Sequence, residues 1–361
     1  MEVGIIGLPL AGKTTIFNAL TRSQAQTGGY SSGRGGINVA VVDVPDPRVD
    51  TLSRMFKPRK TIYAKVQFND VSGVAKGQAQ GSGLDLAILT ALSKCDALLL
   101  VVRAFENDQV AHPDGSVDAL RDLEALRFEL IISDLGIVDR KLERLEAGLK
   151  KARSDERPHM EDEKALMLRL KAALEAETPI SNVELAEEEE HLLRSYQFLT
   201  AKPTLVVLNA GEEVSNNLDL PALARFKHTS ALELRGALEM EIAQLPADEM
   251  ALFLQSYGIA EPGLNVMVRA SYELLGLMSF FTVGEDEVRA WTVRRGATAV
   301  EAAGAIHTDL ARGFIRAEVI SYDDMIACGT LAEARNRGKL RLEGKTYIVQ
   351  DGDILNIRFS V

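Results

Sequence analysis

Short runs of apolar residues alternate along the chain with stretches in which apolar residues recur at helical spacing. Runs of this length are typical of buried strands, and the intervening periodicity is typical of helices. The runs rich in Val, Ile and Leu fall at residues 3–6, 64–70, 97–103 and 204–209. This alternation predicts an α/β fold with a mostly parallel sheet. A further strand is predicted at 37–44, and its turn-rich link to residues 62–70 permits an antiparallel edge pair.

The pattern changes between residues 126 and 199, where Leu, Ile and Ala recur at helical spacing among many Glu, Lys and Arg. Two long helices packed as an antiparallel hairpin are predicted, with their turn in the polar stretch 154–161, because Pro158 ends the preceding helix. An apolar strand resumes at Thr204, so the hairpin is inserted into an α/β domain formed by residues 1–125 and 200–276. Its charges fit a solvated face or a partner surface, and the solvated face is the simpler interpretation.

Residues 277–361 form short strands separated by glycines, which predicts a small α+β module whose helix covers residues 301–310. Five basic residues lie close together there: Arg335, Arg337, Lys339, Arg341 and Lys345. They favour either one RNA-binding face or a basic sheet surface balanced by Asp351 and Asp353.

Composition limits the remaining classes of protein. The chain has 361 residues, a formal net charge of −11 and two distant cysteines, Cys95 and Cys328. This balance argues against coating of nucleic acid by the whole molecule, and the cysteine spacing argues against a zinc or redox motif. No stretch approaches the roughly 20 apolar residues of a membrane helix, and the N-terminus lacks a secretory signal pattern. We therefore expect a cytoplasmic protein without membrane contact.

The strongest chemical signal is the loop GLPLAGKT at residues 7–14, which fits GxxxxGK[ST] between a strand and a helix. Glycines in such a loop let successive backbone N–H groups turn inward at a helix N-terminus, which favours a triphosphate. Lys13 is expected to reach the β and γ phosphates, and the Thr14 hydroxyl to bind the bridging Mg²⁺. The predicted nucleotide-binding residues here are Leu10, Ala11, Gly12, Lys13, Thr14 and Thr15.

Two further strand ends carry GTPase-like motifs. The sequence from Asp70 to Gly73 reads as DxxG, in which Asp70 holds Mg²⁺ through water and the Gly73 N–H meets the γ-phosphate. The sequence from Asn209 to Glu212 stands where a GTPase carries NKxD, with Ala210 at the Lys place. The longer carboxylate of Glu212 weakens the case for guanine selectivity, so base preference stays open. Residues 230–231 are a candidate for the last base-contacting loop.

Together these residues resemble the YchF/Ola1 family of Obg-related GTPases, and the similarity spans essentially the whole chain. The most specific stretch begins FFTVGEDEVRAWTVRRGATAVEAAGAIHTDLARGFIRAEVISYDD and ends GKTYIVQDGDILNIRF. It resembles the TGS module, a ubiquitin-like β-grasp domain, and places that domain at 277–361. The resemblance implies a P-loop GTPase-type sheet with an inserted helical hairpin, hydrolysis of ATP and/or GTP, and association with the ribosome.

The family also implies roles for individual residues. The backbone around Ala210 would meet the adenine edge, and Asn209 would support that loop. Val74 stands where other GTPases carry a catalytic glutamine, and the family's replacement, a loop histidine that positions water, falls on His112. The alternative for His112 is a solvent-facing loop residue beside Pro113.

Three residues depart from the family pattern. Leu10 replaces Asn, Thr14 replaces Ser, and Arg34 replaces a Thr of switch I. Because the Thr hydroxyl should bind Mg²⁺, Ser31 or Ser32 would have to substitute for it, or Arg34 would contact phosphate directly. These departures bear on hydrolysis more than on binding.

The sequence therefore favours a nucleotide-dependent switch with slow, Mg²⁺-dependent hydrolysis, in which Lys13 and His112 are the catalytic candidates. We expect it to be a monomer that contacts the ribosome or its RNA through the TGS and helical domains. A P-loop phosphotransferase and a nucleotide-binding regulator without turnover are the alternatives.

Overall fold

The computed structural model describes residues 1–23, 30–32, 37–71, 86–107, 109–211 and 220–360. Contacts divide the chain into two compact units. Unit 1 contains residues 1–41 and 67–267, and unit 2 contains residues 42–66 and 268–361. Both units combine helices with a sheet, which confirms the predicted α/β fold with a C-terminal α+β part.

Unit 1 is built on a seven-stranded sheet of order β2-β3-β5-β1-β6-β7-β8. Its strands are β1 (Glu2–Ile6), β2 (Tyr30–Ser32), β3 (Asn38–Asp43), β5 (Lys65–Asp70), β6 (Ala97–Ala104), β7 (Thr204–Ala210) and β8 (Thr229–Leu234). The pairs β1–β5, β1–β6, β6–β7 and β7–β8 are parallel, and β2 pairs antiparallel with β3 at the edge. The apolar runs of the sequence are the central strands, since seven of the eight residues of β6 are buried.

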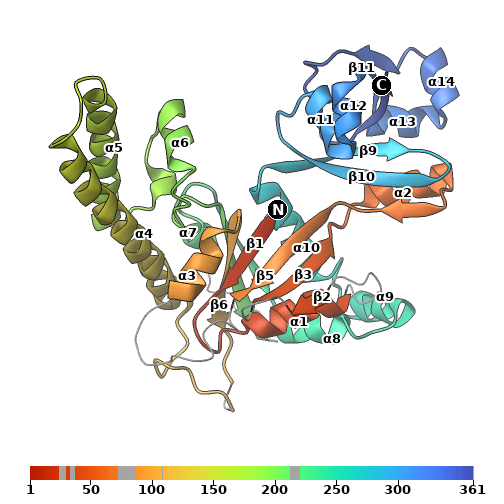
Figure 1. Cartoon of the computed structure of the whole chain (residues 1–361). Coiled ribbons are helices and arrows are strands. Elements are labelled where there is room, and N and C mark those ends of the chain that lie inside the picture. The colour runs from red at the N-terminus through yellow and green to blue at the C-terminus, as the bar shows by residue number, and fades with distance from the viewer. Residues whose placement is uncertain (24–29, 33–36, 72–85, 108, 212–219, 361) are drawn as a thin grey trace. The chain divides into compact units, whose positions relative to one another are not determined.

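Some helices of unit 1 pack on this sheet, and others extend away from it (Figure 1). They are α1 (Lys13–Ser23), α3 (Leu86–Ser93), α4 (Ala119–Leu149), α5 (Arg157–Glu175), η2 (Ile180–Asn182), α6 (Glu187–Leu193), α7 (Leu220–Leu223), α8 (Gly236–Ile242), α9 (Ala247–Ser256) and α10 (Gly263–Leu274), which continues into unit 2. The first half of α4 packs Leu126 and Leu130 against Leu100 and Val206 of the sheet. Its second half extends away with α5 (Figure 1).

Helices α4 and α5 form the predicted hairpin, held by an apolar seam that includes Val138, Leu142 and Leu170. Charged residues pair across it: Lys141 with Glu163 at 2.8 Å, Lys171 with Asp139 at 2.8 Å and Lys164 with Glu146 at 3.0 Å. The predicted role of Pro158 is wrong, because this proline lies in the first turn of α5 instead of ending α4. Proline suits a first turn because its fixed φ is helical and no N–H partner is needed there.

Unit 2 is a six-stranded sheet of order β12-β11-β13-β9-β10-β4. Its strands are β4 (Lys60–Ile62), β9 (Leu277–Val283), β10 (Glu287–Arg294), β11 (Phe314–Ser321), β12 (Arg341–Glu343) and β13 (Asp353–Phe359). Strand β4 and helix α2 (Pro47–Phe56) come from residues 42–66, which the sequence analysis placed in the nucleotide-binding domain. β4 pairs parallel with β10, so this sheet takes its edge strand from far away in the sequence. The domain boundaries drawn from the sequence remain a prediction.

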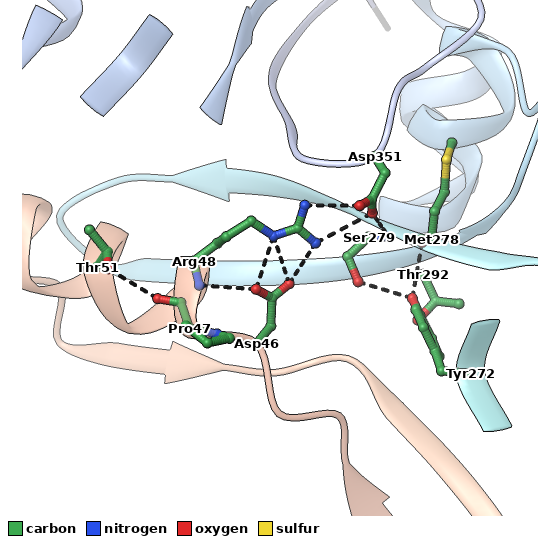
Figure 2. Close-up of polar contacts among 9 residues, drawn as sticks. All are labelled: Asp46, Pro47, Arg48, Thr51, Tyr272, Met278, Ser279, Thr292 and Asp351. Atoms are coloured by element: carbon green, nitrogen blue, oxygen red, sulfur yellow. Dashed lines mark hydrogen bonds and ion pairs between the residues drawn. The ribbon is translucent and has the colours of Figure 1, made fainter. Parts of the chain in front are cut away.

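A polar network ties α2 to the C-terminal strands (Figure 2). Asp46 caps α2 by accepting from the Arg48 N–H at 3.0 Å. The Arg48 guanidinium donates to Asp46 at 2.8 Å and to Asp351 at 2.9 Å, and Asp351 also accepts from the Ser279 N–H. Burial lowers the pKa of Arg48, but these two carboxylates outweigh that effect and raise it. Tyr272 extends the network by donating to the Met278 carbonyl at 2.9 Å.

The helices of unit 2 are α11 (Ala299–Ile306), α12 (Thr308–Arg312), α13 (Tyr322–Cys328) and α14 (Leu331–Asn336). The helix predicted at 301–310 is therefore two helices, since α11 ends before His307 and His307 caps α12. Most of the basic cluster is neutralised locally: Arg335 pairs with Glu318, Arg337 with Glu333, Lys339 with Asp324 and Arg341 with Glu343. These partners are not the predicted Asp351 and Asp353: Asp351 pairs with Arg48, and Asp353 lies 3.9 Å from Arg341. RNA binding by this face stays a prediction.

Across the described ranges, no helix combines the length and apolarity needed to cross a bilayer.

Candidate functional site

The phosphate loop connects β1 to α1 and is held in shape by its glycines and one strained residue. A Cβ on Gly7 would lie 2.3 Å from the Val101 carbonyl of β6, so only glycine fits this approach. Leu10 and Gly12 both have positive φ, 65° and 90°, which turns the backbone at the point where the loop enters α1. Leu10 is 52% exposed, whereas Ala11 is buried. Only Gly12 adopts such a φ without steric cost, so Leu10 holds a conformation that its own side chain opposes.

Lys13 curls over this loop. Its ammonium donates to the carbonyls of Gly7 and Leu8, each at 2.8 Å. Burial lowers the pKa of Lys13, and the nearby carboxylate of Asp70 acts in the opposite direction. A part-buried ammonium satisfied by only two carbonyls favours an anion beside it.

Thr14 and Asp70 carry oxygen atoms of the kind that Mg²⁺ prefers, and Mg²⁺ binding by them stays a prediction. The Thr14 side chain is exposed in the first turn of α1, next to Lys13, and makes no hydrogen bond to a described residue. Asp70 is the last residue of β5, is 1% exposed and interacts electrostatically with Lys13. No cluster of three or more His, Cys, Asp or Glu that could hold a metal occurs among the described residues. One hydroxyl and one carboxylate fit an ion whose remaining ligands are phosphate oxygens and water.

Asn209 joins three strand ends through its buried amide. Its Nδ2 donates to the Ala11 carbonyl at 3.0 Å, and its Oδ1 accepts from the Gly236 N–H at 3.0 Å. Asn209 thereby links the phosphate loop to the segment after β8. Ala210 follows it as the buried last residue of β7. Their contacts with a base stay a prediction.

The loop after β8 corrects one assignment from the sequence. Residues 230–231, predicted to lie in a base-contacting loop, lie inside β8. At that end of the strand, Arg235 connects β8 to α8, whose first residue is Gly236. A Cβ on Gly236 would lie 2.7 Å from Asn209 Oδ1, and this requirement for glycine is a signal that the sequence analysis missed.

His112 is held by hydrogen bonds in the structure, whereas the alternative from the sequence was a solvent-facing loop histidine. Its Nε2 lies 2.8 Å from Asp122 Oδ2, and its side chain is 5% exposed. The Asp114 N–H donates to Nδ1 at 3.1 Å, so a neutral imidazole carries its proton on Nε2 and donates it to Asp122. Arg121 donates to the other oxygen of Asp122. The contacts with Asp122 and Asp114 fix the orientation of the His112 ring, and Arg121 in turn holds Asp122. The sequence analysis did not identify Asp122 or Arg121.

Arg103 and Phe105 are further residues that the sequence analysis missed. Arg103 is the penultimate residue of β6, pairs with Asn209 of β7, and donates to the carbonyls of Phe105 and Val110. The Arg103 side chain is buried, and its Nη1 has no partner among the described residues. Phe105 lies close to where a Cβ of Gly12 would be, so this segment adjoins the phosphate loop.

Several candidate residues lie outside the described residues: Arg34, Gly73, Val74 and Glu212, together with the side chains of Ser31 and Ser32. Thr15 lies half-buried in the first turn of α1.

Two family models match the chain, one at each end. Residues 277–360 match the model of the YchF-GTPase C-terminal region, described as a protein of unknown function (DUF933), and residues 2–133 match the model described as 50S ribosome-binding GTPase. The chain is 40% identical over 368 residues to the ribosome-binding ATPase YchF of Bacillus subtilis, covering 100% of both chains. The chain belongs to the YchF family.

Two more YchF proteins extend this result. The ribosome-binding ATPase YchF of Haemophilus influenzae is 42% identical and is covered to 99% of its length. The solved structure of the Schizosaccharomyces pombe YchF GTPase is 31% identical, with a TM-score of 0.89 over 99% of this chain and 97% of that one. Membership of the YchF family, together with the intact phosphate loop, identifies the chain as a nucleoside triphosphatase.

Proposed function

We propose that this chain binds ATP or GTP with Mg²⁺ at the loop of residues 7–14, hydrolyses it slowly, and acts at the ribosome. The observation that carries the proposal is the Lys13 ammonium folded over the carbonyls of Gly7 and Leu8 at the N-terminus of α1. A triphosphate would offer this ammonium stronger, charged acceptors, and the backbone N–H groups of the loop would complete the anion site.

Each remaining residue has a role in this proposal. Thr14 and Asp70 would hold Mg²⁺, which when bound neutralises charge on the phosphates. Asn209 keeps the phosphate loop in register with the segment after β8 through its two hydrogen bonds. Gly73 and Glu212 are proposed γ-phosphate and base contacts on the strength of their motifs. The choice between ATP and GTP is proposed to depend on the backbone of residues 209–212.

Ribosome binding comes to the proposal from the printed names of the relatives. The helical hairpin and unit 2 are the candidate contact surfaces. Basic residues of unit 2 pair with carboxylates of the same unit. We therefore do not expect a large patch of unpaired cations there for phosphate binding. Co-sedimentation with ribosomes, with and without a non-hydrolysable ATP analogue, tests this part directly.

Calorimetric titration with ATP and GTP analogues tests nucleotide binding. Wild type should bind at least one of them, and Lys13→Ala should weaken binding by roughly 100-fold, since a charge-assisted contact to phosphate is lost. Lys151→Ala, at an exposed lysine in the hairpin turn, is the control. No measurable binding of either analogue by wild type would refute the proposal.

His112→Ala tests catalysis separately. If His112 orients water, phosphate release should fall by about 10²-fold or more while nucleotide affinity is kept. His159→Ala, at an exposed histidine of α5, should change neither quantity. Unchanged phosphate release in His112→Ala would leave the Asp122 contact as a purely structural one.

A further inference from the structure

A cavity of about 300 Å³ lies in unit 1 at the base of the helical hairpin. One wall is the first half of α4, which includes Ala125, Phe128 and Ile131. The second wall is formed by the segments just before and at the start of β7 and β8, including Lys202, Thr204 and Thr229. Residues 177–181, which follow α5, close the third side.

This cavity is distinct from the nucleotide site. The phosphate loop, Asp70 and Asn209 lie at the carboxyl ends of their strands, whereas Thr204 and Thr229 are the first residues of theirs. Because β7 and β8 run parallel, the cavity lies at the opposite end of the sheet. Its α4 wall belongs to the half of that helix that packs on the sheet, before the hairpin extends away (Figure 1).

The lining is mostly apolar and includes one lysine, Lys202, whose ammonium pairs with no described carboxylate. Leu100, Leu130 and Leu199 are buried there, and Phe128 is 49% exposed at the mouth. Lys202 donates to the Cys95 carbonyl but forms no ion pair with any described carboxylate. Burial lowers the pKa of Lys202, and Asp96 and Asp134 act against this from a distance.

The other charged side chains around the cavity form ion pairs or hydrogen bonds, or are exposed to solvent. Arg127 pairs with Glu124 at 3.1 Å and lies over the Phe226 ring, and Arg225 pairs with the same Glu124. Asp134, behind the wall, is saturated by the N–H groups of Leu199 and Thr200 and by the Thr200 hydroxyl. Glu177 is exposed at the rim. A ligand that enters therefore meets Lys202, whose ammonium pairs with no described carboxylate, two arginines at the wall that share the carboxylate of Glu124, and the hydrated carboxylate of Glu177 at the rim.

We propose that this cavity binds a small amphipathic monoanion, with its apolar or aromatic body against Phe128, Leu130 and Leu199 and its anionic group on Lys202. The size is at the lower end of small-molecule sites, and a largely apolar lining with few polar anchors is their usual chemistry. The exposed carboxylate of Glu177 at the rim disfavours a second negative charge on the ligand, and the class that we propose is therefore monoanions. Because α4 and residues 177–181 both line the cavity, the ligand contacts both roots of the hairpin.

The probe is 8-anilinonaphthalene-1-sulfonate, an aromatic monoanion, with uncharged 1-anilinonaphthalene as its matched control. Fluorescence titration of the full chain, with ATP present at saturation, should give one saturable site for the anion. Lys202→Met should weaken the anion by roughly tenfold, as expected for loss of one charge-assisted contact, and leave the uncharged probe unchanged. Ala125→Trp should abolish binding of both, and Lys151→Met should change neither.

Saturable binding that is equal in Lys202→Met and wild type, or that survives in Ala125→Trp, would overturn the proposal, as would the absence of a saturable site. Circular dichroism checks that each variant is folded. Should Ala125→Trp fail to fold, Ser181→Phe, on the loop across the cavity, blocks the same space and gives the same two outcomes.

Discussion

The shape of the phosphate loop depends on the absence of a side chain at Gly12. Gly12 has a φ of 90°, and a Cβ at this position would lie 2.1 Å from Asn209 Nδ2. The same amide nitrogen donates to the Ala11 carbonyl, so any side chain at Gly12 displaces the bond that holds the loop. The glycine of the sequence motif is thus explained by the neighbouring strand as well as by its own backbone angle.

Gly12→Ala should therefore weaken nucleotide binding by roughly tenfold to 100-fold, because it combines an unfavourable positive φ with loss of one buried hydrogen bond. Titration calorimetry measures the effect. Gly115→Ala is the matched control, since Gly115 also has a positive φ, 78°, but has open space around its Cβ position. Equal affinities in the two variants would show that the contact with Asn209 is unimportant.

Individual elements are joined by buried polar anchors. Asp134 lies on α4 and is fully buried, and it binds the backbone of residues 199–200 just before β7. It thereby fixes the returning chain of the inserted hairpin to the outgoing helix. Burial raises the pKa of Asp134 to about 6, despite the opposing hydrogen bonds from Thr200 and Leu199.

Asp134→Asn should destabilise the protein, because an amide brings two N–H donors, one more than a protonated carboxyl, against the N–H groups of Leu199 and Thr200. The cost should also depend on pH. The folded-state pKa lies above the unfolded value, so the protonated group stabilises the fold fully below about pH 4 and this contribution is lost as pH rises through about 6. The difference in melting temperature between wild type and Asp134→Asn should therefore shrink from pH 4.5 to pH 6.5. A difference that grows over this interval would contradict the raised pKa.

The two compact units of the molecule are not continuous in sequence, since each contains two separate segments of the chain. Residues 42–66 lie between two strands of the first sheet in sequence but belong to unit 2, where β4 pairs with β10. Val49 and Leu52 of α2 are completely buried. Arg48 adds polar contacts to Asp351 near the C-terminus (Figure 2). Unit 2 is therefore complete only when both parts of the chain are present.

Removal of residues 277–361 should leave α2 and β4 without the strands on which they pack. We expect this truncated chain to aggregate or to bind apolar dyes, because Val49 and Leu52 become exposed. Size-exclusion chromatography with fluorescence measures both effects. Trimming only residue 361 is the control. A monomeric, cooperatively unfolding chain 1–276 would show that residues 42–66 do not need the C-terminal strands.

The parallel strands, the inserted hairpin and the phosphate loop could be predicted from the amino-acid order, because each follows from local periodicity or from a motif whose residues are adjacent. Lys13, Thr14 and Asp70 were predicted as site residues in this way. Three features became visible only in the folded chain: the hydrogen bond between His112 and Asp122, the bridge from Asn209 to Gly236, and the cavity beside Lys202. Their residues are brought together by strand pairing and helix packing, which bury them or place their polar atoms within hydrogen-bond distance, and no local pattern encodes that proximity. The allocation of residues 42–66 to unit 2 has the same cause, since β4 finds its partner more than 200 residues away.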